Sequence, residues 1–349
     1  MKELNNINYS FMGTFLRCKD DIYSFSREQN ILFDIDRNNL ALKSIDFLPN
    51  EDFSKRDLIS EIKVWKNKLI FIPCNASSIY IKENNIYRTI NLEKYVNKNL
   101  NNKFYGSVIY KDCLYMFGHW ASIILGVDLN EEKIVFAYNV PEKFISMKNQ
   151  KNDAYFSDYL LEGEKVYLPF LSEGYIAVLN LQTKDIQWIK VADETNGFSL
   201  ILRYKQGVFI LCRRNERGMV LYDEINNKVK SMFEKIDFRY GINISSVGFK
   251  VLVTCYDNCS YFFEIESGKY EVKNDKCFRV IIEGDELIKI KKEGIEILDL
   301  KNNNSRTLDI YYSNFNCLIN EKRKEINACM NGIVQESTPF LLESFVKVV

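Results

Sequence analysis

Histidine is almost absent from this sequence of 349 residues, since His119 is the only one. A zinc site of the usual two- or three-histidine type therefore cannot be built within one chain. A Ser/His/Asp or Cys/His arrangement would have to use His119, and no Gly-x-Ser-x-Gly nucleophile elbow occurs. Cys255 and Cys259 lie close together, but no second cysteine pair completes a zinc site. The sequence thus predicts neither a metal nor a cofactor.

An excess of positive charge is also missing. Lys and Arg together number 47, and Asp and Glu together number 47. Proteins that bind nucleic acids usually carry a basic excess or stripe, because neutralising phosphates supplies much of the affinity. A local basic patch remains at Arg213, Arg214 and Arg217. We predict no nucleic-acid partner.

Long apolar runs are lacking as well. None reaches the roughly 18 residues of a membrane-spanning helix, and the start Met1–Asn6 leads into no apolar run of signal-peptide length. The nine cysteines are odd in number and scattered, with several inside apolar stretches such as Ile210-Leu211-Cys212. Cysteines used as small core residues are typical of a reducing compartment. We predict a cytoplasmic protein without membrane contact, and the Asn-, Lys- and Ile-rich composition suggests an AT-rich, bacterial genome.

What the sequence has in quantity is strand-forming residues. Hydrophobic residues make up 46% and aromatic residues 14%, while there are only 5 prolines and 15 glycines. Phe and Tyr favour strands over helices, and the low proline and glycine content argues against a disordered chain.

A unit of about 45 residues recurs along the chain. It consists of a charged turn, an apolar strand, a polar turn, a second apolar strand that ends in an acid or amide, and a third strand. Two units match turn for turn, and their strands are Cys113–Phe117, Ile123–Leu129 and Ile134–Phe136 in one, and Lys165–Phe170, Tyr175–Leu181 and Ile186–Ile189 in the other.

Each unit is also preceded by a further strand, expected at Phe11–Arg17, Ile62–Trp65, Tyr105–Tyr110, Tyr159–Leu161, Phe198–Tyr204, Ile244–Gly248 and Phe278–Ile282. The position at the end of the second apolar strand is occupied in the seven units by Asp34, Lys82, Asp128, Asn180, Asp223, Glu264 and Asp299. All of these are acids or amides except Lys82. A short polar side chain there can hydrogen-bond the turn backbone, so this position is structural.

Four short strands per unit are typical of a propeller blade. We predict an all-β, seven-bladed β-propeller over residues 1–312, with six or eight blades and a β-sandwich as alternatives. Residues 313–349 are expected to form an extension packed on the propeller. They end either in a short helix, with Thr338 as its N-cap and Pro339 at its first position, or in a closing strand, Phe345–Val349. Residues 1–10 are expected to pair with the last blade.

In its repeat form the chain resembles the kelch-like and quinoprotein-like propellers over nearly its whole length. It departs from kelch repeats because no unit has a paired glycine after the second strand, and from Trp-Asp repeats because no Trp is followed by Asp. The resemblance implies the superfold, and a superfold assigns no function.

The loops between second and third strands, together with the starts of the first strands, form the face on which propellers usually bind ligands. We predict that this face binds the ligand or partner through a mixed set of aromatic and charged residues: Tyr105, Trp120, Phe156, Asp158, Arg213, Arg214 and Arg279. Trp120 is read as a stacking platform for a sugar or peptide, or else as a cap on the blade's core. Catalytic candidates are His119, otherwise a surface loop histidine, and Glu173 with Asp257 as an acid/base pair.

Three functions follow. The first is a non-catalytic module that recognises a protein, peptide or glycan through this face. The second is an enzyme, a lyase or a glycoside-active enzyme, that uses carboxylates in a central pocket. The third is an assembly scaffold whose C-terminal helix docks a partner through Phe340, Leu341 and Phe345.

Overall fold

The computed structural model is an all-β protein, and its only described helix is the single turn α1 (Glu142–Ile145). The described residues are 14–18, 21–26, 30–36, 38, 41–52, 55–84, 86–145, 154–193, 197–214, 217–238, 241–247, 249–255, 259–273, 277–283, 285–291, 294–299, 301–302 and 304–309.

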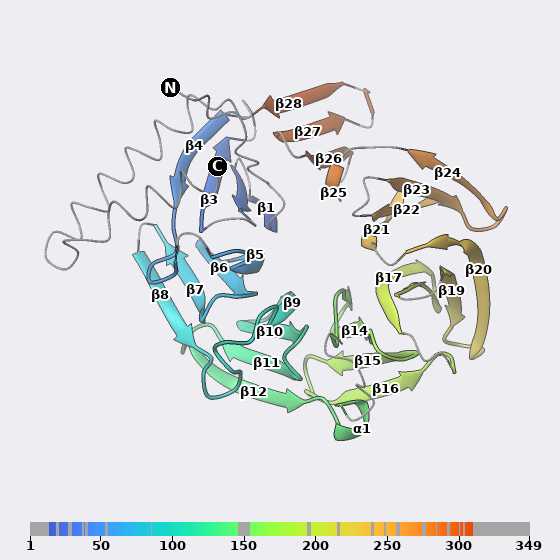
Figure 1. The fold of residues 1–349 in the computed structure, drawn as a ribbon, viewed down its shortest axis with the longest axis horizontal. Coiled ribbons are helices and arrows are strands. Elements are labelled where there is room, and N and C mark those ends of the chain that lie inside the picture. Colours follow the sequence, from blue (N-terminus) through green and yellow to red (C-terminus); the bar gives the residue numbers. More distant parts are fainter. Residues whose placement is uncertain are drawn as a thin grey trace, which may run out of the picture. The chain divides into compact units, whose positions relative to one another are not determined.

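The strands form seven four-stranded antiparallel sheets, each built from four consecutive strands (Figure 1). The first three sheets are β1 (Thr14–Cys18), β2 (Asp21–Phe25), β3 (Leu32–Asp36) and β4 (Ala41–Asp46); β5 (Ile59–Trp65), β6 (Lys68–Pro73), β7 (Ser78–Glu83) and β8 (Ile86–Asn91); and β9 (Phe104–Tyr110), β10 (Cys113–Gly118), β11 (Ile123–Asp128) and β12 (Lys133–Asn139).

The other four sheets are β13 (Leu160–Glu162), β14 (Lys165–Pro169), β15 (Tyr175–Asn180) and β16 (Ile186–Lys190); β17 (Phe198–Lys205), β18 (Val208–Arg213), β19 (Arg217–Asp223) and β20 (Lys228–Asp237); β21 (Gly241–Val247), β22 (Lys250–Cys255), β23 (Ser260–Glu264) and β24 (Lys269–Lys273); and β25 (Cys277–Glu283), β26 (Glu286–Lys291), β27 (Gly294–Asp299) and β28 (Ser305–Asp309). These sheets are the seven blades of a β-propeller, which confirms the predicted fold class and places all seven expected first strands.

In the blades of residues 104–213 the second and third strands are mostly apolar because both of their faces are buried. In β15, Ala177 and Leu179 pack toward blade three, while Ile176 and Val178 pack toward blade five. The fourth strands instead have one exposed face, and in β12 exposed and partly buried residues alternate along the whole strand. This difference is why the inner strands are the clearest part of the sequence repeat.

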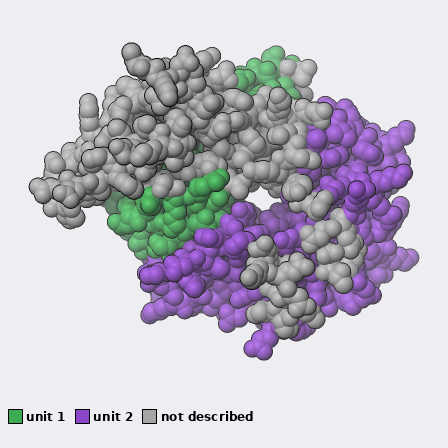
Figure 2. Space-filling model, in the orientation of Figure 1, with its two compact units in different colours: residues 1–89, 283–349 green, residues 90–282 purple. Residues whose placement is uncertain are grey.

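The chain divides into two compact units, residues 1–89 with 283–349 and residues 90–282 (Figure 2). Within each unit, neighbouring blades touch through their first strands, β1 with β5 in one and β17 with β21 in the other. In the first unit, Arg306 of β28 donates a hydrogen bond of 3.3 Å to the carbonyl of Asn38, between β3 and β4. The first and last blades are therefore in contact.

The strand register corrects the repeating acid or amide position in two blades. Asp21 at the start of β2 faces Asp36, so the first blade uses Asp36 and not Asp34. Leu69 faces Lys82, so the residue opposite Lys68 in the second blade is Glu83. The exception predicted at Lys82 was wrong, and all seven blades carry an acid or amide here. The error arose because a strand offset of one or two residues leaves the apolar pattern looking similar.

The structural role predicted for this position is confirmed. The Asp128 carboxylate accepts hydrogen bonds from the backbone N–H groups of Asn130 and Glu131, at 2.9 and 3.0 Å. Asn180, Asp223 and Asp299 accept two such bonds each, and Asp36 accepts one from Asn38. These side chains fix the turn between the third and fourth strands.

Asp34, which has no such turn to hold, gives a first testable prediction. Burial raises its pKa, the charge of Asp21 raises it further, and Lys43 offsets this in part. Its buried Oδ1 has no hydrogen-bond partner among the described residues. We therefore expect Asp34→Asn to stabilise the protein at pH 7 by roughly 0.5 kcal/mol, the size of a cross-strand charge pair. Urea unfolding of both proteins measures the difference.

The direction in which the stability difference between wild type and Asp34→Asn changes with pH provides a check. A carboxyl whose folded-state pKa is raised stabilises the fold only while it is protonated, and that contribution is lost as pH rises through the folded pKa. The advantage of Asp34→Asn should therefore shrink as the pH falls through the raised folded-state pKa, and it should be lost below the ordinary pKa of aspartate, about 4. An advantage of the same size at pH 3 and pH 7 would contradict this explanation.

Several expectations concern residues outside the described ranges. These are the pairing of residues 1–10 with the last blade, the extension at residues 313–349 and its helix or closing strand. They stay predictions. The described part of the chain contains no helix with the length and apolar character of a membrane span.

Candidate functional site

Two kinds of connection meet at one end of each described blade. We call the loop between the second and third strands of a blade its b–c loop, and the connection from its fourth strand to the next blade its d–a segment. The set of b–c loops and d–a segments in residues 90–282 is called the loop face of the second unit. It carries most of the site residues predicted from the sequence.

A chain of backbone hydrogen bonds runs through the loop face of the second unit and joins three successive blades. Each residue in it accepts a bond through its carbonyl or donates one through its N–H, and most do both. The donor-to-acceptor steps are Arg214 to Gly197 (3.0 Å), Gly197 to Leu171 (3.3 Å), Leu171 to Tyr155 (2.9 Å), Tyr155 to His119 (2.6 Å) and His119 to Lys103 (2.8 Å). Because b–c loops and d–a segments alternate along this chain, each loop is held by its neighbour, and aligned peptide groups polarise one another.

Gly118 allows the b–c loop of blade three to turn tightly just before His119. A Cβ atom at this position would lie 1.9 Å from the carbonyl oxygen of Ala121 and 2.5 Å from that of Ile123. No side chain fits there. The loop that carries His119 and Trp120 is therefore fixed by close backbone packing as well as by hydrogen bonds.

The structure brings His119 together with two other predicted residues. Its ring lies 4.4 Å from the Tyr105 ring, centroid to centroid, at 46°. Its Nδ1 lies 2.6 Å from the carbonyl oxygen of Phe156. A carbonyl only accepts hydrogen bonds, so Nδ1 carries a proton and Nε2 is the basic nitrogen of the neutral ring. The Phe156 ring itself is fully buried and lies against Phe170, so its carbonyl is what it brings to the loop face.

Trp120 follows His119 on the same loop and is partly exposed. Its backbone N–H donates to the carbonyl of Asn102 at 3.0 Å. Within the described ranges, the indole ring neither contacts another ring nor donates its N–H. The indole is thus a partly exposed ring on a fixed backbone, and its role as a stacking platform or as a cap on the blade's core stays a prediction.

Three other predicted residues make internal contacts. The Asp158 carboxylate accepts the backbone N–H of Ile201 at 2.9 Å and so ties blade four to the first strand of blade five. Arg213 is buried, and its guanidinium donates to the Ser231 hydroxyl on the outer strand β20 at 2.8 Å. Arg214 is partly buried, and its backbone ends the hydrogen-bonded chain. Only some of the charged side chains predicted for this face therefore point outward.

The predicted carboxylate pair is not assembled by the described residues. Glu173 lies partly exposed in the b–c loop of blade four, where its charge raises the pKa of Lys190 slightly, after the larger effect of Asp193. Asp257 lies outside the described residues. Arg279 belongs to strand β25, but the structure does not describe its side chain. In the described ranges, no three His, Cys, Asp or Glu side chains gather closely enough to hold a metal ion.

Lys103 is a member of this face that the sequence did not reveal. It is 1% exposed and lies in the d–a segment before β9, beside His119. Lysine is almost never fully buried unless its ammonium group is paired. Nothing in the run Asn101-Asn102-Lys103 signals burial, because the neighbouring residues are polar and typical of an exposed turn. Only the packing of the loops around it identifies this residue.

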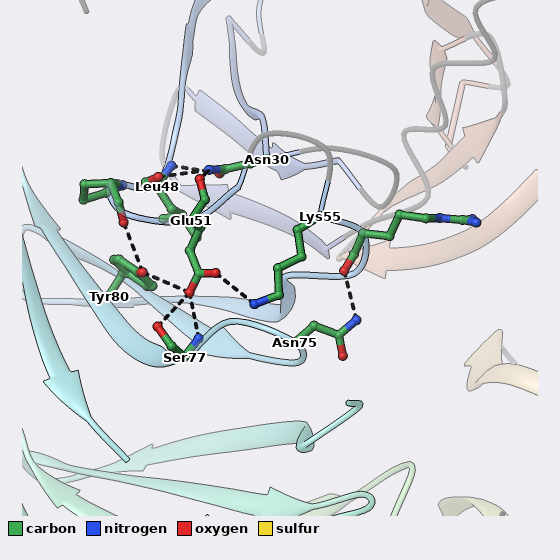
Figure 3. A network of polar contacts seen from close by, with 9 residues as sticks. Asn30, Leu48, Glu51, Lys55, Asn75, Ser77 and Tyr80 are labelled. Carbon is green, nitrogen blue, oxygen red and sulfur yellow. Dashed lines mark hydrogen bonds and ion pairs between the residues drawn. The ribbon is translucent and has the colours of Figure 1, made fainter. Parts of the chain in front are cut away.

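In the first unit, a buried glutamate organises the corresponding connections of blades one and two (Figure 3). The Glu51 side chain is 4% exposed. Its Oε1 accepts the backbone N–H and the hydroxyl of Ser77 at 2.7 and 2.9 Å, with the Tyr80 hydroxyl at 3.1 Å. Its Oε2 lies 3.0 Å from the Lys55 ammonium nitrogen. The Glu51 carboxylate thus joins the start of the d–a segment to the b–c loop of blade two, and backbone bonds from Cys74, Asn75 and Ala76 join the end of the segment to the same loop.

Asn30 makes a matching attachment in blade one. Its side-chain amide accepts the N–H of Leu48 and donates to the Leu48 carbonyl, both at 2.9 Å. The Asn30 amide therefore makes the pair of hydrogen bonds that the backbone of a neighbouring strand would otherwise make with Leu48. Burial would raise the pKa of Glu51, but the hydrogen bonds from Ser77 and Lys55 and the Lys55 charge together lower it. The Glu51 carboxylate is therefore ionised and fully hydrogen-bonded, as expected of a structural group.

The fold is similar to solved propellers at low sequence identity. A virginiamycin B lyase from Staphylococcus aureus matches with a TM-score of 0.62 and 12% identity over 82% of this chain and 94% of that chain. BamB from Moraxella catarrhalis matches with a TM-score of 0.54 and 12% identity over 80% of this chain and 78% of that chain. The Pan2 WD40 domain from Neurospora crassa matches with a TM-score of 0.50 and 9% identity over 84% and 87%.

No family model and no curated protein sequence matches the chain. At these identities the similarity shows the fold alone, and the matched propellers differ in what they do. The similarity therefore agrees with the propeller superfold predicted from the repeat and gives no specific family.

Proposed function

We propose that the protein is a non-catalytic binding module that recognises a protein or peptide through the loop face of the second unit. The observation that supports this most directly is Trp120, a partly exposed indole on a loop whose backbone is fixed at both Gly118 and Asn102. Tryptophan is enriched among the residues that dominate binding energy, and a rigid backbone loses little entropy on binding.

The charged groups on the same face fit binding better than catalysis. Asp158 is engaged in a bond between blades four and five, Arg213 in a bond within blade five, and His119 is held by Tyr105 and the Phe156 carbonyl. A catalytic constellation needs a nucleophile or acid/base pair within hydrogen-bond reach of one reacting atom. The Trp120 indole, which contacts no other ring among the described residues, suits a peptide or a protein loop.

The test is affinity capture from a lysate of the source organism with three baits: the wild type, Trp120→Ala and Phe249→Ala. The wild type is expected to retain a protein partner, and Trp120→Ala should weaken its affinity by about 10- to 100-fold, the range of an interface anchor residue. Calorimetric titration of the recovered partner against each bait measures the change.

Phe249→Ala is the matched control because it removes another exposed aromatic ring from the same unit. Phe249 is 77% exposed and lies between the first and second strands of blade six, so it belongs to the other class of turn. Its removal should leave the affinity unchanged. A partner that binds Trp120→Ala as well as it binds the wild type would refute this face as the binding site.

An enzyme of the lyase or glycoside-active class is the second candidate, and His119 is the observation that favours it. A structure of the Staphylococcus aureus lyase is of a histidine-to-alanine variant that is catalytically inactive, solved with quinupristin. In this chain the His119 ring is held through Nδ1 at the Phe156 carbonyl, and Glu173 lies in the b–c loop of the next blade. The predicted partner of Glu173, Asp257, lies outside the described residues. Turnover of a substrate that is lost in His119→Ala while Trp120→Ala still turns it over would favour this alternative.

A further inference from the structure

The structure places two cysteines opposite each other at the root of the b–c loop of blade six. Thr254 of β22 pairs with Ser260 of β23, so the next pair toward the loop is Cys255 with Cys259. The backbone N–H of Cys255 donates to the carbonyl of Cys259 at 2.9 Å. Opposite residues in a hydrogen-bonded antiparallel pair have Cα atoms about 5.5 Å apart, within the range of roughly 4.4 to 6.8 Å found in disulfides.

The two side chains also share a side of the sheet. Residues directly opposite each other in an antiparallel pair project to the same face. Val251, Val253 and Cys255 pack in the hydrophobic cluster between blades five and six. The Cys259 side chain therefore projects toward the same cluster, next to Cys255. Neither cysteine is in a disulfide in this structure.

The two thiols differ in access, which gives them different parts in an oxidation. Cys255 is 1% exposed, whereas Cys259 is partly exposed. A third cysteine, Cys212, is fully buried in the same cluster, and burial and then the neighbouring Cys255 raise the pKa of its thiol. An attacking thiol must be accessible and ionisable. Of the three, only Cys259 meets the first condition.

We propose that Cys255 and Cys259 form a reversible disulfide that joins β22 to the start of β23, by exchange with a low-molecular-weight disulfide. The Cys259 thiolate attacks one sulfur of the small disulfide, breaks its S–S bond and releases one thiolate, which takes up the proton lost by Cys259. The Cys255 sulfur then attacks the Cys259 sulfur, and the second small thiol leaves with the proton of Cys255. Two protein thiols are oxidised, and one disulfide is reduced to two thiols.

Because the two cysteines are close in the sequence, this disulfide constrains the chain locally and adds little to the stability of the whole fold. Only residues 256–258 separate the two cysteines in the sequence, and the stabilisation from a disulfide grows with the length of the loop it closes. Disulfides in a reducing compartment are usually transient and redox-sensing. The two cysteines flank a connection of the same class as the one that carries Trp120. The disulfide itself does not depend on the proposed function, whereas any effect on binding does.

The test uses the full-length protein equilibrated with reduced and oxidised glutathione, alkylated, cleaved with trypsin and weighed. Residues 251–269 form one tryptic peptide that contains Cys255 and Cys259 and no other cysteine. We expect this peptide to escape alkylation and to be two hydrogen atoms lighter in oxidising buffer, and to be doubly alkylated after reduction. Cys259→Ser should abolish the effect, and Cys212→Ser should keep it.

Cys113 supplies the internal control because it is a partly buried cysteine of blade three with no cysteine opposite it, its strand partner across β11 being Asp128. It should stay alkylatable in both buffers. Full alkylation of peptide 251–269 in oxidising buffer would overturn the proposal. A cross-link between that peptide and residues 206–213, which contain Cys212, would overturn it as well. Loss of partner binding is a separate readout, so its failure would count against the proposed function and not against the disulfide.

Discussion

Replacing Glu51 by alanine is expected to lower the free energy of unfolding by about 3–5 kcal/mol, the cost of removing one partner from a buried charged network. The carboxylate receives hydrogen bonds from Ser77, Tyr80 and Lys55 and is almost fully buried. Alanine would leave the backbone N–H and the hydroxyl of Ser77 without their acceptor, and each buried unsatisfied group costs about 1–3 kcal/mol. Urea unfolding followed by tryptophan fluorescence measures the loss.

The stabilisation by Glu51 should also change with pH in a definite direction. The folded-state pKa of Glu51 is lowered below its ordinary value, so its contribution is present above the unfolded-state pKa and is lost as pH falls through the folded one. Glu51→Gln keeps the shape of the side chain and one acceptor oxygen but not the charge. The stability difference between wild type and Glu51→Gln should therefore shrink below about pH 4, the ordinary pKa of glutamate.

Glu83→Ala is the matched control in the same unit. Glu83 has a side chain that is 46% exposed and pairs with Lys68 and Arg88, both at 3.3 Å. An exposed ion pair contributes about 0–1 kcal/mol, so its loss should be small. Equal effects of Glu51→Ala and Glu83→Ala would show that the network in Figure 3 does not hold the two connections together.

Arg203→Ala is expected to cost about 2–3 kcal/mol, because this side chain joins blades four and five through both charge and packing. Its Nε lies 2.6 Å from the Glu162 carboxylate, and Nη2 makes a second bond to the same carboxylate. Its Cζ lies 3.6 Å from the centre of the Phe209 ring, a cation–π contact. The alanine variant loses both bonds to the Glu162 carboxylate and also leaves the Phe209 ring without its covering guanidinium group.

The control for this prediction is Arg203→Lys, which keeps the charge and most of the stem but cannot make the two-pronged bond. It should lose about half as much stability as the alanine variant. A double-mutant cycle with Glu162→Gln isolates the pair from the ring contact. If the cycle gives no coupling energy, the salt bridge between the blades contributes nothing, and any loss in Arg203→Ala comes from packing on Phe209.

Both predictions concern groups that the sequence pattern could not single out. Glu51 lies in a polar connection, Leu48-Pro49-Asn50-Glu51-Asp52, in which either acid reads as exposed. Arg203 lies near the end of a strand whose last residues are Arg, Tyr and Lys. Their partners are distant in sequence or belong to another blade, and nothing local to the sequence specifies such pairs.

In the candidate site, too, the sequence predicted some features and could not reveal others. The sequence placed His119 and Trp120 on a b–c loop because the apolar runs on either side of them are the second and third strands of a blade. It did not reveal that Arg213 turns toward Ser231 on the outer strand, or that Lys103 is buried beside His119. It also placed the repeating acid at Asp34 and Lys82, where the register has Asp36 and Glu83.

The sequence by itself determined the class of fold and the positions of the first strands, and it favoured seven blades, because these depend on a short-range strand pattern repeated seven times. Burial of both faces makes the middle strands of the central blades mostly apolar, and that signal needs no knowledge of distant contacts. Only the tertiary structure decided which loop residues face outward, which charges are internal and which cysteines are opposite each other. Those outcomes depend on strand register and on contacts between blades, which join residues far apart in the chain.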